Sequence, residues 1–121
     1  MTKNMTKNIK RNFQLVMQFP LTDVNTEIFD RIIAIEKELA MLLKDKHQLG
    51  EHAMSENTMS ILINTADPEE AFEIAKNAVP EEDLGVMSVA MKGINSHEYT
   101  VIWPEDYQGE FRIDKHIDKI N

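Results

Sequence analysis

Hydrophobic and polar residues alternate along four stretches of this chain, and each alternation predicts a β-strand. Residues 13–19 alternate strictly and end at Pro20. The same two-residue period returns over residues 59–64, 86–91 and 99–103. Because successive side chains of a strand point to opposite faces, this period is typical of half-buried strands. A polar stretch over residues 51–57 precedes the strand at residues 59–64. This order suits a hairpin whose second strand is the one at 59–64 and lies centrally in the sheet.

A longer stretch repeats its hydrophobic residues every three or four positions and predicts an amphipathic helix. Polar residues within 22–25 can cap its start, and Gly50 breaks its pattern. Near its end, Lys44, Lys46 and His47 would complement the helix dipole. The apolar face expected to enter the core consists of Ile28, Ile32, Ile35, Leu39 and Leu42.

Capping residues predict the start of a second, shorter helix. Asp67 can cap it, Pro68 fits the first helical position, and Glu70 completes a variant of the capping box. Pro80 stops it. Its expected apolar face consists of Ala71, Phe72, Ala75, Ala78 and Val79.

Taken together, the elements follow one another in the order β-α-β-β-α-β-β. The most economical fold for this order is an α+β ferredoxin-like sandwich, in which two helices cover one face of a mainly antiparallel sheet. The length of 121 residues is typical of one domain. We expect that domain to span residues 12–114, with a disordered basic tail over 1–11 and a flexible tail over 115–121.

Five short motifs follow one another between residues 13 and 113. They are Gln18-Phe19-Pro20, His52, Ile61-Leu62-Ile63-Asn64-Thr65 with Asp67-Pro68, Tyr99-Thr100-Val101-Ile102-Trp103-Pro104, and Gly109-Glu110-Phe111. In order and spacing they resemble a widespread family of small, uncharacterised bacterial proteins with no established activity. The most distinctive polar stretch of that family reads His-Asp-x-Gly-Ser-Gly-Glu-x-Asn, and residues 52–60 retain only His52. The resemblance therefore implies a scaffold used for binding rather than for catalysis.

Composition narrows the class of protein further. Hydrophobic residues make up 42% and charged residues 28% of the chain, which is typical of a globular protein. The absence of cysteine excludes disulfides, thiolate metal ligands and cysteine nucleophiles. No apolar run approaches the length of a membrane span, and the stretch after the basic N-terminus is too interrupted for a signal peptide. We expect a cytoplasmic protein that does not enter membranes.

The charge is unevenly distributed along the chain. The net charge is −8, but residues 1–12 hold four basic and no acidic side chains. The remainder has nine basic and 21 acidic side chains, a charge of −12. Such a field repels nucleic acid and anionic lipid and attracts basic proteins, although solubility alone is a competing explanation.

Acidic side chains gather around the second helix, where only Lys76 opposes them. Helix capping and the helix dipole account for part of this block, because both favour negative charge in a first turn. The remainder is a candidate surface for a basic protein partner. The candidate partner-binding residues are Asp67, Glu69, Glu70, Glu73, Glu81, Glu82 and Asp83.

A weaker candidate is a pocket at His52 and Glu56, near Glu51. One imidazole with two carboxylates suits a divalent metal or acid–base chemistry, but a solvated turn has the same composition. The other histidines, at positions 47, 97 and 116, stand alone and are expected at the surface or in turns. No phosphate-binding loop or nucleophile elbow is present, so we expect no catalytic residue, cofactor or metal.

Aromatic residues in the last strand offer one more candidate surface. Tyr99 and Trp103 fall on the same face by alternation, where they serve either the core or a binding hot spot. Three classes of function follow, in order of preference. The first is a protein-binding module, such as an immunity protein that inhibits a basic nuclease toxin; the second is a small-molecule or metal-binding domain; the third is an enzyme of unrecognised type. A homodimer through an edge strand is compatible with each.

Overall fold

The computed structural model describes residues 10–21, 26–55, 57–107, 109, 111 and 113. The elements run in the order β1 (Phe13–Pro20), α2 (Thr26–Leu42), β2 (His47–Met54), β3 (Thr58–Thr65), α3 (Pro68–Ala78), α4 (Glu81–Leu84), β4 (Ser88–Gly93) and β5 (Thr100–Trp103). Residues 1–9 and 115–121 lie outside the described residues, so the two tails stay predictions. None of the helices in the described part of the chain has the length and apolar character needed to cross a membrane.

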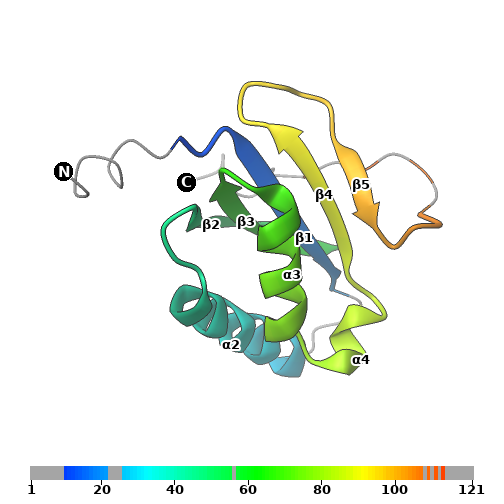
Figure 1. The fold of residues 1–121 in the computed structure, drawn as a ribbon. Helices are drawn as coiled ribbons and strands as arrows, with labels where there is room; N and C mark the ends of the chain where they lie inside the picture. The colour runs from blue at the N-terminus through cyan, green and yellow to red at the C-terminus, as the bar shows by residue number, and fades with distance from the viewer. Residues whose placement is uncertain are drawn as a thin grey trace.

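The sheet has five strands in the order β2-β3-β1-β4-β5, and every neighbouring pair is antiparallel. The two long helices, α2 and α3, lie on the same face of it (Figure 1). Strands β1 to β4 with these two helices form the predicted ferredoxin-like sandwich, and β5 extends the sheet beyond β4. The α+β fold class is therefore confirmed. The short helix α4 is an addition that the alternation of residues did not reveal.

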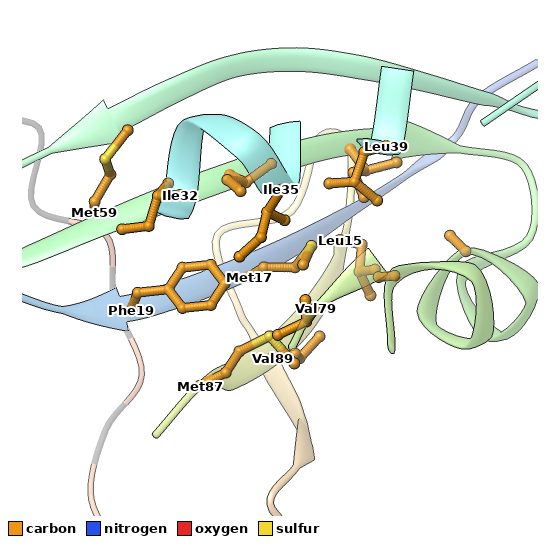
Figure 2. Packing of buried hydrophobic residues seen from close by; sticks show 14 of the residues in the cluster. Leu15, Met17, Phe19, Ile32, Ile35, Leu39, Met59, Val79, Met87 and Val89 are labelled. Carbon is orange, nitrogen blue, oxygen red and sulfur yellow. The ribbon is translucent and has the colours of Figure 1, made fainter. Parts of the chain in front are cut away.

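The main core fills the space between the helices and the sheet (Figure 2). From the helix α2, Ile32, Ile35 and Leu39 are at most 2% exposed, as their spacing predicts. The sheet contributes the same face of its three inner strands. Those residues are Leu15, Met17, Phe19, Met59, Ile61, Ile63 and Val89.

The end of α2 differs from the prediction. The helix stops at Leu42, and Asp45 turns the chain with a positive φ of 52°. Leu42 is 40% exposed, whereas Leu43 just beyond the helix is 9% exposed and enters the core in its place. His47 does not belong to the helix end, because it starts β2 opposite Thr65. The hairpin needs these residues as a strand, and that non-local pairing overrides the local helical pattern.

The last strand also departs from simple alternation. The register of β4 and β5 shifts so that Ile102 is an extra residue between the pairs Val89–Trp103 and Ala90–Val101. Such a bulge lets two successive side chains face the same side. Ile102 and Trp103 accordingly pack on the helix side, and Tyr99 packs on the other face of the sheet. The prediction that Tyr99 and Trp103 share a face was wrong.

Candidate functional site

Part of the predicted acidic block lines a hollow beside the first turns of α3. The hollow measures ≈ 460 Å³, and three apolar side chains lie among its acidic ones. The apolar part comes from three different elements, because Phe72 belongs to α3, Met91 to β4 and Ile102 to β5. The lining residues are Asp67, Glu69, Glu70, Phe72, Glu73, Met91 and Ile102. Four of the seven predicted partner-binding residues thus meet in one place.

Three of these four carboxylates already have partners within the chain, and one of them, Glu73, lies 3.1 Å from the Lys76 ammonium. The Asp67 carboxylate caps α3 by accepting the Glu70 N–H at 3.2 Å. Glu70 in turn accepts a hydrogen bond from His47 at 2.8 Å, and its second oxygen lies 3.6 Å from the Lys46 ammonium. Glu69 is the carboxylate of the hollow that is exposed and has no ion pair among the described residues.

His47 is buried, contrary to the expectation that it lies at the surface or in a turn. Its ring bridges two elements: Nδ1 lies 2.7 Å from Thr65 Oγ1, and Nε2 lies 2.8 Å from Glu70 Oε1. Thr65 Oγ1 also accepts the Asp67 N–H at 2.8 Å, so its own hydrogen is free to go to Nδ1. The Glu70 carboxylate can only accept a hydrogen bond, so Nε2 of His47 carries a proton. His47 thereby fixes Glu70 at the edge of the hollow.

The hydrogen bond from His47 is the main influence that lowers the pKa of the Glu70 carboxyl below its ordinary value of 4.5. The nearby charges of Lys46 and His47 act in the same direction, while desolvation and the charge of Asp67 oppose them. Glu70 therefore keeps its negative charge to lower pH than an isolated glutamate does.

This pKa shift predicts a pH-dependent effect of Glu70→Gln on stability. A lowered folded-state pKa contributes stability that is fully present above the ordinary value of 4.5 and is lost as pH falls through the folded pKa. The variant is therefore expected to be less stable than wild type at neutral pH and equally stable in strong acid. Urea unfolding across this pH range measures the difference. Glu69→Gln is the control, and a Glu70→Gln deficit that persists in strong acid would contradict the interpretation.

The remaining acidic candidates lie apart, on α4. Glu81 and Glu82 are exposed, but Asp83 is only 6% exposed. Its carboxylate receives three hydrogen bonds of 3.1 to 3.2 Å from the Arg31 guanidinium, which belongs to α2. Asp83 thus ties α4 to α2, and this role was not foreseen from its place in an acidic run. Glu82, Asp83 and Arg31 line a second, smaller hollow of ≈ 170 Å³.

The weaker candidate pocket has a different composition from the one predicted. His52 is half exposed, and its Nδ1 lies 3.2 Å from Glu36 Oε2 on α2. Glu56, the other candidate, lies outside the described residues. Within the described part of the chain, no group of three histidine, aspartate or glutamate side chains is arranged to hold a metal ion.

Sequence reasoning found the carboxylates of the hollow but missed His47 and the apolar residues among them. His47 and Leu49 alternate at the start of β2, and this short signal was masked by the preceding helical pattern. Met91 and Ile102 reach α3 only through the sheet pairing. Compared with protein-family models, curated proteins and solved structures, the chain has no significant match. The resemblance to a bacterial family therefore stays a prediction.

Proposed function

We propose that this protein is a binding module that captures a basic protein through the hollow beside α3. The observation that carries the proposal is the composition of the hollow: four carboxylates placed around Phe72, Met91 and Ile102. Long basic side chains are complementary to such a surface, because their alkyl stems cover apolar groups while their charged ends meet carboxylates.

A cation of the chain itself supports this chemistry. The Lys76 ammonium lies 3.1 Å from Glu73 Oε2 and 4.7 Å from the centroid of the Phe72 ring. Phe72 and Glu73 line the hollow. An aromatic ring and a carboxylate side by side thus already accommodate an ammonium group here, and a lysine or arginine of a partner would bind to the same two groups by displacing Lys76.

The charge of the whole chain supports the same class of partner. The chain after residue 12 carries −12, and this field speeds the approach of a basic protein. A nuclease toxin is a basic protein of this kind, and an inhibitor of it needs no catalytic group of its own. The proposed role is therefore that of a small acidic inhibitor of a basic toxin, of the type represented by immunity proteins.

The first experiment is to identify the partner by capture from native lysate and then measure its binding kinetics. Two double variants remove the same amount of charge from different places. Glu69→Gln with Glu73→Gln alters the hollow, whereas Glu81→Gln with Glu82→Gln alters exposed residues of α4. Asp67 and Glu70 are left intact because they hold α3 and His47.

Both variants are expected to slow association by a similar factor, because long-range attraction depends on total charge. Only the variant in the hollow is expected to speed dissociation, by about tenfold or more, because its carboxylates contact the partner. Raising the salt concentration should mimic the shared effect on association. Equal dissociation rates for the two variants would show that the partner binds elsewhere. An association rate that does not change with salt concentration would show that long-range charge attraction plays no part in binding.

A further inference from the structure

Hydrophobic side chains are unusually exposed on α2. Four of the six large hydrophobic residues that stand exposed in the described part of the chain lie on this helix: Phe29, Ile33, Met41 and Leu42. Phe29, Ile33, Glu36 and Ala40 are spaced four, three and four residues apart. They therefore form one stripe along the helix, which we call the α2 flank.

The contacts of α2 show which way this flank faces. Glu36 belongs to it and bonds to His52 of β2, so the flank lies on the side of β2. Arg31 lies on the other side of the helix and bonds to Asp83 of α4. Figure 1 agrees, since α2 and β2 lie on the side of the molecule away from β5.

Beside the flank, β2 is an edge strand of eight residues. It pairs with β3 alone, and within the described residues no other segment pairs with its outer edge. Both edge strands carry a register shift, but the opposite edge strand, β5, is half as long and is followed by Pro104, so it is the better protected of the two. The α2 flank and the edge of β2 thus form one continuous surface with apolar side chains and unpaired backbone groups.

We propose that this surface binds a second copy of the chain. A twofold axis perpendicular to the sheet would set β2 antiparallel to its copy and extend the sheet across both molecules. The same axis sets the two α2 helices antiparallel, flank against flank. The proposal is independent of the basic partner, because the hollow beside α3 does not include this surface.

Charge and size complementarity favour a copy over an unrelated protein. Asp30 and Lys37 are exposed beside the flank, seven residues apart, and neither has an ion pair among the described residues. In an antiparallel arrangement with its axis near Ile33, Asp30 of each copy faces Lys37 of the other. Phe29 of each copy then faces the small Ala40, and the two Ile33 side chains meet near the axis. An axis between Ile33 and Ala34 sets Asp30 directly opposite Lys37 and leaves the Ile33 pair about one residue, and the Phe29–Ala40 pair about two residues, out of register.

Sedimentation equilibrium of the full chain tests the proposal. Wild type is expected to show twice the chain mass of 14.0 kDa. Ile33→Asp brings two carboxylates together near the axis and is expected to reduce the mass to that of one chain. Ile94→Asp is the matched control: Ile94 lies in the turn after β4 and is 39% exposed, against 40% for Ile33. A monomeric wild type, or a dimer that survives Ile33→Asp, overturns the proposal.

A charge exchange tests the antiparallel arrangement itself. Asp30→Lys and Lys37→Asp each turn two attractions into two repulsions, so each is expected to weaken the dimer by about tenfold. Combining both substitutions restores opposite charges in the reverse sense and should return the affinity to that of wild type. Slow exchange of backbone amides on the outer edge of β2, lost in Ile33→Asp, would support the strand pairing. A double variant as weak as the single ones, or fast exchange of the outer-edge amides of β2 in the dimer, overturns this arrangement.

Discussion

Replacing Leu39 with aspartate is expected to unfold the domain. Leu39 is 0% exposed and lies among Ile35, Val79 and the sheet residues in the main core (Figure 2). The variant would bury a carboxylate with no partner, which costs several kcal/mol in addition to the lost apolar contacts. Because a domain of this size is stable by roughly 5–15 kcal/mol, this loss removes most or all of the stability. Circular dichroism during thermal melting measures it.

The matched control for this experiment lies two residues further along the same helix. Met41 is 71% exposed, so Met41→Asp introduces the same charge in the same helix without burying it. The control is expected to melt within a few degrees of wild type, since surface substitutions typically change stability by less than about 0.5 kcal/mol. Wild-type melting of Leu39→Asp would mean that α2 presents a different face to the sheet.

Arg31→Met is expected to cause the second largest loss of stability, about 3 kcal/mol. The substitution preserves much of the side-chain volume but removes the guanidinium that donates to the Asp83 carboxylate. Asp83 is 6% exposed, so water can replace the lost donors only in part. Arg31 itself is 35% exposed, but its removal leaves the buried carboxylate without this partner, which is costly. Urea unfolding of wild type and variant gives the difference in free energy directly.

A double variant separates the ion pair from the packing around it. Arg31→Met combined with Asp83→Leu removes both charges, so no carboxylate is left buried without a partner. It is therefore expected to be more stable than Arg31→Met alone. If the double variant is instead the less stable of the two, the loss comes from packing and the ion pair contributes little.

The acidic hollow shows which residues of a site can be predicted from the sequence and which cannot. The carboxylates Glu69, Glu70 and Glu73 could be found because they lie within one helix, and charges within one helix are close in space. Met91 and Ile102 could not be connected to them, because they are about 20 to 30 residues away and reach α3 only through the strand pairings of β1 with β4 and β4 with β5. The charged residues of the hollow could therefore be predicted from one segment of the sequence. Its apolar residues could not, because they come from other segments.

Those parts of the structure that depend on local periodicity could be predicted without knowledge of the fold. Alternation located β1, β3, β4 and β5, and the spacing of Ile32, Ile35 and Leu39 identified the buried face of α2, because the side-chain period follows directly from backbone geometry. The end of α2, the burial of His47 and the position of Trp103 beside Phe72 of α3 could be known only from the folded chain. Each of these depends on pairing between segments distant in the chain, and the energy of that pairing exceeds the weak local preferences it overrides.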